Sequence, residues 1–162
     1  AGDIFLMGYS SGGNLAFEMT KRLELAGIEV SGLILLDSWR RIKAQHLSEQ
    51  AIQEIIDWHH QSAEQTILSE MHDVASLTAY LGDISQRVNS GQVKANIHSI
   101  QAEHQDVEQG ASQEYLTLDW QQSTLGHYQV HQGQGDHLSL FSKQAIDHNR
   151  RILEEVVTCG KV

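Results

Sequence analysis

Short apolar runs and a longer helical stripe alternate along the first part of the chain. Ile4–Met7 is a continuous apolar run before a glycine, which predicts a strand buried on both faces. Residues 13–26 place apolar side chains at helical spacing, and Gly27 supplies a stop signal. Leu33–Leu36 is a second buried-strand run and ends at Asp37. A strand, a glycine-rich turn, a helix and a strand form a βαβ unit, which predicts a parallel sheet covered by helices.

A long stretch without strand signals follows, although a helix-to-strand connection usually needs about 2–6 residues. Amphipathic stripes predict helices over about 48–60 and 66–81, and a shorter helical piece over 83–89. We interpret the insertion, residues about 40–90, as a helical lid over the functional end of the sheet. An ordinary layer of crossover helices fits the same stripes.

The last part of the chain returns to alternating elements. We expect a third strand over 93–102, a polar loop over 103–113, a fourth strand over 127–132 and a closing helix over 142–157. The fold class is therefore α/β, with a mostly parallel sheet covered by helices and a helical insertion. The length of 162 residues suits a single domain, 1–162.

Composition narrows the class of protein. Hydrophobic residues make up 40% of the chain, which is enough for a core, and the net charge of −10 argues against a nucleic-acid or anionic-lipid partner. The longest apolar runs are far too short to span a bilayer. The single cysteine, Cys159, cannot form an internal disulfide, which suits a reducing compartment and predicts a cytoplasmic location.

The turn after the first strand carries the strongest chemical signal. Gly8-Tyr9-Ser10-Ser11-Gly12 fits the Gly-x-Ser-x-Gly pattern between a strand and a helix. In that context Ser10 occupies a sharp, strained turn with an exposed hydroxyl. Gly8 and Gly12 fit this turn, because we expect room for only very small side chains two residues to either side of Ser10. The Ser11 amide and the helix N-terminus would stabilise an oxyanion.

Two other interpretations of this turn remain. A strand, a glycine-rich turn, a helix and an acid after the next strand also describe a dinucleotide site, with Asp37 binding the ribose. That site requires glycine at the middle position, where this chain has Ser10, so the residues favour a nucleophile. The turn could also be purely structural.

A serine nucleophile needs a base and an acid to orient the base. In this fold the chain order is serine, acid, histidine, and Asp37 follows a strand as the acid should. Asp37 could instead be a helix cap or a solvated loop acid, and Asp106 and Asp119 are the fallback acids. Among the ten histidines, His137 alone lies in a glycine-bearing loop between the last strand and the last helix, so we predict it as the base. No histidine pair has the His-Glu-x-x-His spacing, so we predict no metal site.

Four segments in order resemble one family over nearly the whole chain. Residues Gly8–Glu18 resemble the nucleophile elbow of the C-terminal thioesterase domains of nonribosomal peptide synthetases, especially those that release cyclic lipopeptides such as surfactin and fengycin. Leu35–Arg41 resembles the family's strand, acid and basic pair, Ser90–Ile97 the approach to its next strand, and Gly135–His137 its Gly-x-His segment.

The resemblance implies an α/β-hydrolase with a mobile helical lid, Ser10 as nucleophile, Asp37 as acid and His137 as base. The family has further strands before the elbow, and a loop after one of them supplies a second oxyanion amide beside that of Ser11. We therefore interpret the chain as an N-terminally truncated fragment, assign function to the parent domain, and do not expect the isolated fragment to be active.

The implied function is release of a peptidyl or lipopeptidyl chain from the phosphopantetheine thioester of a partner carrier domain. Release would pass through a serine acyl-enzyme, by macrocyclisation or hydrolysis, with no cofactor of the domain's own. The basic residues Arg40, Arg41 and Lys43 would meet the pantetheine phosphate, although a solvated turn explains them equally well. A stand-alone editing thioesterase, a polyketide thioesterase or a lipase would use the same triad, and a non-catalytic binding module would carry the fold alone.

Overall fold

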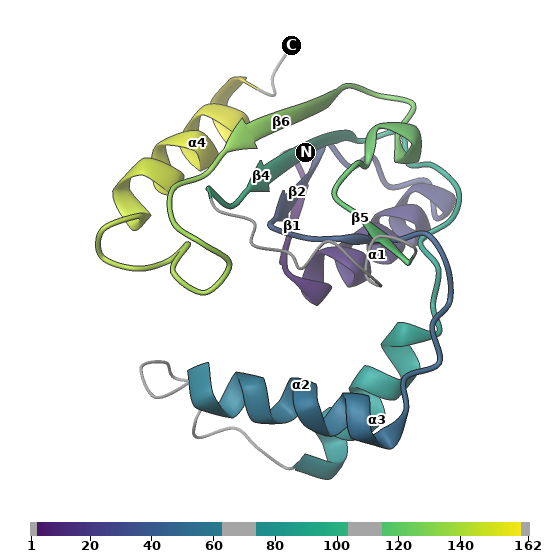
Figure 1. The fold of residues 1–162 in the computed structure, drawn as a ribbon. Coiled ribbons are helices and arrows are strands. Elements are labelled where there is room, and N and C mark those ends of the chain that lie inside the picture. Colours follow the sequence, from purple (N-terminus) through teal and green to yellow (C-terminus); the bar gives the residue numbers. More distant parts are fainter. Residues whose placement is uncertain (1–2, 63–73, 104–114, 160–162) are drawn as a thin grey trace. The chain divides into compact units, whose positions relative to one another are not determined.

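The structure, a computed structural model, describes residues 3–62, 74–103 and 115–159 and divides the chain into two compact units (Figure 1). The first unit combines Ala1–Ile42 with Asn89–Val162, and the second is Lys43–Val88.

A four-stranded sheet forms the centre of the first unit. Its strands are β1 (Phe5–Tyr9), β2 (Gly32–Leu36), β4 (Asn96–Gln101) and β6 (Tyr128–Gln132), in the order β1-β2-β4-β6. All three pairings are parallel, so the carboxyl ends of the strands meet at one edge (Figure 1). This confirms the α/β class with a parallel sheet.

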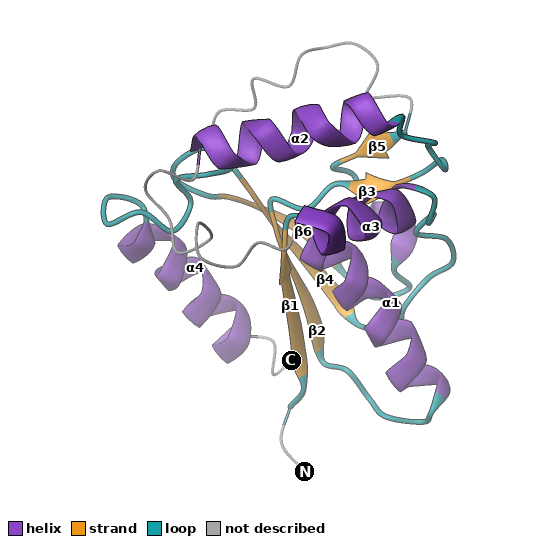
Figure 2. Cartoon of the chain, turned by 90° about the horizontal axis from the view of Figure 1, so that it is seen from below, coloured by secondary structure: helices purple, strands orange, loops and turns teal. Residues whose placement is uncertain are grey.

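Two helices cover opposite faces of this sheet (Figure 2). They are α1 (Ser11–Leu25) and α4 (Ile146–Cys159). Each face has its own apolar core, because successive β2 side chains alternate between the two sides. The core on the α1 side contains Ala16, Phe17, Val30, Leu33, Leu35, Val93, Ala95, Ile97 and Trp120. The core on the α4 side contains Ile34, Leu36, Ile100, Ala102, Leu140 and Val156.

The second unit contains α2 (Glu49–Ser62) and α3 (Val74–Ser85). The Ser48 hydroxyl accepts a hydrogen bond from the Ala51 amide at 3.1 Å and so caps the start of α2. Helix α3 runs without interruption through Gly82, so the predicted break before residue 83 and the separate helical piece over 83–89 are wrong. A Cβ on Gly82 would lie 4.0 Å from Ile52 Cδ1, which shows that this glycine packs close to α2 rather than ending α3.

Several boundaries also differ from the predicted ones. β4 begins at Asn96, and Val93 instead forms an isolated bridge with Thr124. α4 begins at Ile146, because the amides of Ala145 and Ile146 both bond to the Ser142 carbonyl in a preceding turn. No sequence pattern predicted the short antiparallel pair β3 (Arg40–Arg41) and β5 (Leu116–Thr117) or the 3-10 turn η4 (Gln121–Ser123). The predicted helix over 66–81 and the loop over 103–113 fall partly outside the described residues.

Among the helices that the structure describes, none has the length and apolar character that crossing a membrane would require.

Candidate active site

The turn between β1 and α1 holds Ser10 in a strained backbone conformation. Its φ is 52° and its ψ is −129°, a region that residues other than glycine rarely occupy. The Ser10 amide donates to the Leu36 carbonyl at 2.9 Å, which extends the β1–β2 pairing by one residue into the turn. The neighbouring strand therefore fixes the backbone of Ser10.

The glycines around this turn have unequal roles. A Cβ on Gly8 would lie 2.3 Å from the Gly12 carbonyl oxygen, so glycine is required there, as predicted. A Cβ on Gly12 would meet no atom within 4 Å, so the predicted steric need for glycine at this position is wrong. The second tight position is Gly13, where a Cβ would lie 2.2 Å from the Ser38 hydroxyl. The Gly-x-Ser-x-Gly pattern ends one residue before Gly13, so the pattern did not indicate it.

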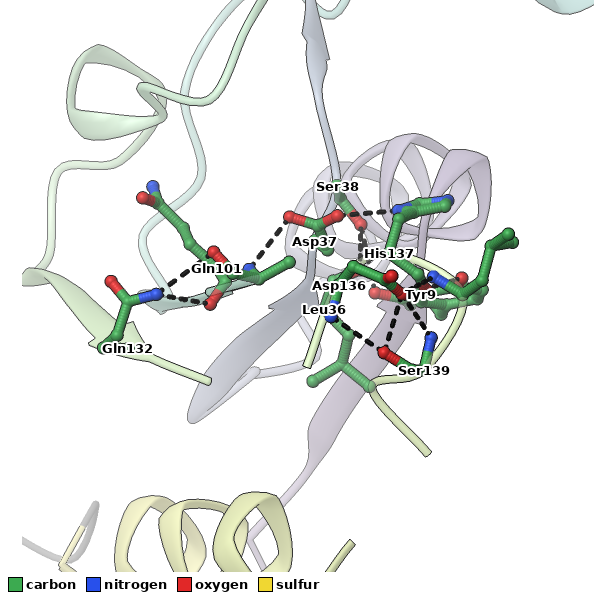
Figure 3. A network of polar contacts seen from close by, with 12 residues as sticks. Tyr9, Leu36, Asp37, Ser38, Gln101, Gln132, Asp136, His137 and Ser139 are labelled. Carbon is green, nitrogen blue, oxygen red and sulfur yellow. Dashed lines mark hydrogen bonds and ion pairs between the residues drawn. The ribbon is translucent and has the colours of Figure 1, made fainter. Parts of the chain in front are cut away.

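Asp37 follows β2 and is held at both carboxylate oxygens (Figure 3). Asp37 is only 3% exposed, and like Ser10 it has a positive φ, of 43°. Oδ1 accepts the Ala102 amide at 3.1 Å, while Oδ2 lies 2.6 Å from Nδ1 of His137. Because a carboxylate only accepts, Nδ1 of His137 is the donor and Nε2 is left as the nitrogen that can act as a base.

Hydrogen bonds between residues next to His137 hold the loop that carries it (Figure 3). Oδ1 of Asp136 accepts hydrogen bonds from the Leu138 amide and from the amide and hydroxyl of Ser139, at 2.7–3.0 Å. These bonds, chiefly those from Ser139, hold the pKa of Asp136 below its usual value. Gly135 has a φ of 89° and supplies the turn before His137.

Helix α4 holds both ends of the same loop through one buried side chain. The Asn149 side-chain amide donates to the carbonyls of Gln134 (2.9 Å) and Leu140 (2.7 Å), and its oxygen accepts the Gln134 amide at 2.8 Å. Asn149 is 3% exposed. This asparagine was expected on the closing helix, but no sequence pattern indicated its role.

Tyr9 lies between the serine turn and the histidine loop. Its ring stacks on the His137 imidazole with centroids 4.9 Å apart and an interplanar angle of 24°, and its hydroxyl donates to the His137 carbonyl. The Phe141 ring meets Tyr9 edge-on at 5.2 Å. Burial, with smaller contributions from the charges of Asp37 and Asp136, raises the pKa of Tyr9 to about 12.

Ser38 and Trp120 form a buried support beneath Asp37, and no sequence pattern indicated this pair either. The Ser38 hydroxyl lies 3.2 Å from the carbonyls of both Gly8 and Leu36, and so bonds to the carboxyl-terminal ends of β1 and β2. The Trp120 indole donates to the Ser38 carbonyl at 2.9 Å, and its ring packs against Phe17 of α1. Both Ser38 and Trp120 are fully buried.

The remaining predicted residues lie as follows. Arg40 and Arg41 form β3 and are half-buried, with Nε of Arg40 donating to the Asn89 carbonyl at 3.3 Å, whereas Lys43 is exposed and begins the second unit. Asp119 accepts the Gln121 amide at 2.8 Å at the start of η4, and Asp106 lies outside the described residues.

Within the described residues, no group of three or more metal-ligating side chains comes together. The pair His98 and His131 does meet across β4 and β6, with ring nitrogens 3.1 Å apart. Burial lowers the pKa of both imidazoles, and the charge of His131 lowers that of His98 further, while Glu155 partly opposes the shift at His131.

The fold and the site together define a class of protein. A serine at a strained strand-to-helix turn lies at the carboxyl edge of a parallel sheet, and the Asp37–His137 pair lies at the same edge. This is the arrangement of the α/β-hydrolases.

The chain belongs to the thioesterase domain family, which matches residues 4–156. It is 34% identical to a mycosubtilin synthase polypeptide of Bacillus subtilis over 98% of the chain, and 28% identical to surfactin synthase subunit 3 of Bacillus subtilis (strain 168) over 99%. The chain spans 6% and 13% of the lengths of these two relatives. It is thus a thioesterase domain of the nonribosomal peptide synthetase type, as the resemblance implied, and the dinucleotide-site interpretation is set aside.

Solved structures agree with this placement. The thioesterase domain SrfTE, which cyclises the lipopeptide antibiotic surfactin, superposes with a TM-score of 0.81 at 26% identity, over 97% of this chain and 68% of that one. Human thioesterase 2 superposes with a TM-score of 0.68 over 99% of this chain and 75% of that one, at 18% identity, and so supports the fold alone.

Proposed function

We propose that this domain releases a peptidyl or lipopeptidyl chain from a carrier-domain thioester, with Ser10 as nucleophile, His137 as base and Asp37 as the orienting acid. The observation that carries the proposal is the 2.6 Å contact between Asp37 and His137. Ser10 is covalently next to Tyr9, whose ring stacks on His137, and its amide bonds to the residue before Asp37. These contacts support a common site for the three side chains.

The chemistry follows from the donor and acceptor pattern. His137 takes the proton of the Ser10 hydroxyl at Nε2 while Asp37 stabilises the imidazolium through Nδ1. The serine oxygen attacks the thioester carbonyl, and the carbon–sulfur bond then breaks. The imidazolium gives its proton to the leaving pantetheine thiolate, so an acyl-enzyme and a free thiol result.

The acyl-enzyme is resolved by a second nucleophile. A hydroxyl or amine of the bound chain gives a macrocycle, and water gives a linear acid; His137 accepts the proton in either case. Ser11 is the first residue of α1, and its backbone amide would stabilise the oxyanion that forms when the acyl-enzyme is made and again when it is resolved.

The second unit, Lys43–Val88, is our candidate for the lid. An apolar cover over the acyl-enzyme would exclude water and favour the internal nucleophile. The domain would need no cofactor of its own, would act in the cytoplasm, and would receive its substrate on the phosphopantetheine of a peptidyl carrier domain.

Activity-based labelling of the full-length domain tests the nucleophile. The domain should react covalently with a fluorophosphonate probe, and Ser10→Ala should abolish the reaction because the attacking oxygen is gone. Ser11→Ala is the matched control, since the proposed role of Ser11 uses only its backbone amide. Asp37→Asn should lower the rate of labelling by about 10⁴-fold by disturbing the tautomer of His137. A folded domain that does not label would contradict the proposal and favour a binding module.

Substrate analysis separates the finer alternatives. Carrier-bound peptidyl thioesters should be processed with higher kcat/KM than simple esters, whereas a lipase would show the reverse order. Reversing the charges of Arg40 and Arg41 should raise KM for the carrier-bound substrate and leave small thioesters unaffected, because only the former presents a pantetheine phosphate on a protein. An equal response of both substrates would remove the basic cluster from the proposal.

A further inference from the structure

Tyr9 joins the two halves of the proposed site, which lie far apart in the sequence. It is the last residue of β1 and directly precedes Ser10, and it touches His137 in two separate ways. Its ring covers one face of the imidazole, and its hydroxyl holds the backbone carbonyl of the same residue (Figure 3).

We propose that Tyr9 is a positioning residue that fixes both the ring plane and the backbone of His137 relative to Ser10. This inference rests on the proposed function, because it assigns Tyr9 to the same reaction.

The geometry explains why such a residue is needed. The bond from Nδ1 to Asp37 is a single contact, so it restrains the imidazole at one nitrogen and fixes the tilt of the ring only weakly. The His137 side chain is 31% exposed, so it is not held by complete burial. A ring stacked at 24° restricts this tilt and keeps Nε2 in one plane.

The hydrogen bond from Tyr9 to the His137 carbonyl should also persist over a wide range of pH. Partial burial, with smaller contributions from the charges of Asp37 and Asp136, raises the pKa of the Tyr9 hydroxyl to about 12. It therefore remains a donor to the His137 carbonyl at neutral and moderately alkaline pH, and the Phe141 ring meets the Tyr9 ring edge-on.

Two substitutions separate the two contacts. Tyr9→Phe keeps the stacked ring and loses the hydrogen bond, so we expect kcat on a small soluble thioester to fall by about threefold. Tyr9→Leu loses both contacts, and we expect a fall of about 30-fold or more. KM should stay within twofold (about the scatter between single measurements) in both variants, because Tyr9 acts on the base rather than on the substrate. Phe5→Leu is the matched control, since it removes another aromatic ring of β1 from the same core, and its kcat should match the wild type.

Proton NMR gives a readout that does not depend on turnover. The His137 Nδ1 proton, bonded to Asp37, should give a downfield resonance in the wild type and in Tyr9→Phe, and this resonance should broaden or vanish in Tyr9→Leu as the ring begins to rotate. Unchanged kcat together with an unchanged resonance in Tyr9→Leu would overturn the inference. If Tyr9→Leu does not fold, an unchanged kcat in Tyr9→Phe overturns the hydrogen-bond half of it.

The two proposals can fail separately. A protein that neither labels at Ser10 nor cleaves thioesters, yet shows the graded NMR response, would refute the proposed function and leave Tyr9 as the residue that orders His137. A protein that cleaves thioesters with full activity in both variants would refute the role of Tyr9 alone.

Discussion

Two single residues with positive φ stand side by side at the carboxyl edge of the sheet. Ser10 and Asp37 follow the paired strand ends Tyr9 and Leu36, with φ values of 52° and 43°. Each such conformation costs about 1–3 kcal/mol. Hydrogen bonds to the next strand offset that cost, from the Ser10 amide to Leu36 and from the Asp37 amide to Ile100. The sheet therefore holds both residues in conformations that the free chain would avoid.

Gly12 and Gly13, which follow Ser10, differ in the space around a Cβ, so substituting alanine at each gives a prediction and its control. Gly13→Ala should lower the free energy of unfolding by about 2 kcal/mol, because the new methyl group would lie 2.2 Å from the Ser38 hydroxyl. Gly12→Ala should be neutral or stabilising by up to about 1 kcal/mol, because its methyl group meets no atom and alanine favours the helix. Urea unfolding of both variants measures the difference. Equal effects of the two substitutions would contradict the close approach of α1 to Ser38.

The histidine pair His98 and His131, which meets across strands β4 and β6, should make the stability of the protein depend on pH. The pKa values of His98 and His131 are lowered in the folded protein, so the unfolded chain binds more protons as the pH falls below about 6.5. The free energy of unfolding should consequently decrease as the pH is lowered through this value. Urea titrations at several pH values from neutral to mildly acidic would record the decrease.

A double variant tests the origin of that dependence. His98→Gln with His131→Gln should make the decline below pH 6.5 (about the ordinary imidazole value) shallower, since neither glutamine titrates. His127→Gln, which changes an exposed imidazole just before β6, is the control and should leave the slope unchanged. A double variant with the wild-type slope would assign the acid sensitivity to other groups.

The attachment of the His137 loop to α4 depends on one side chain. Asn149→Ala removes three hydrogen bonds to Gln134 and Leu140, so we expect it to lower the free energy of unfolding by about 2 kcal/mol. The amides of residues 133–140 should also exchange with solvent faster than in the wild type. Arg151→Ala, at an exposed position of the same helix, should change neither quantity. Unaltered exchange in Asn149→Ala would show that other contacts hold the loop.

The sequence predicted this edge of the sheet better than the supports around it. Ser10, Asp37 and His137 were identified because each follows a strand, and parallel strands end at one edge. Ser38 and Trp120 were missed because a buried serine and a distant tryptophan show no periodic signal before the fold brings them together. The separate helical piece over 83–89 was wrong because α3 continues through Gly82 to Ser85, and a glycine inside a helix looks the same in sequence as one that ends it. The triad itself stays a prediction.

At the scale of the whole molecule, the first unit is continuous in space although the second unit interrupts it in sequence. The chain leaves the first unit at Ile42 and returns at Asn89. The Asn89 amide donates to the Arg41 carbonyl at 2.9 Å, and the Asn89 side chain accepts the Arg41 amide at 3.1 Å. The points of exit and return are therefore adjacent, and both apolar cores lie within the first unit.

This geometry predicts that the first unit tolerates removal of the second. Replacing Lys43–Val88 by a short glycine-serine linker should leave a protein that unfolds cooperatively, because the linker has only to span two residues already joined by hydrogen bonds. Circular dichroism during thermal unfolding would test this against the full chain. A broad, non-cooperative transition in the deletion variant would show that the first unit depends on the second.

The parallel order of the sheet also bears on how the chain assembles during synthesis. β2 is buried along its whole length, yet its second neighbour, β4, emerges from the ribosome only after the entire second unit, since Gly32 pairs with Asn96. One edge of the most apolar strand is thus unpaired for a long part of translation. Parallel pairing of strands that are far apart in sequence is slow, and it leaves unpaired strand edges that are prone to aggregate. The nascent domain should therefore depend on chaperones until residues 96–101 have been made.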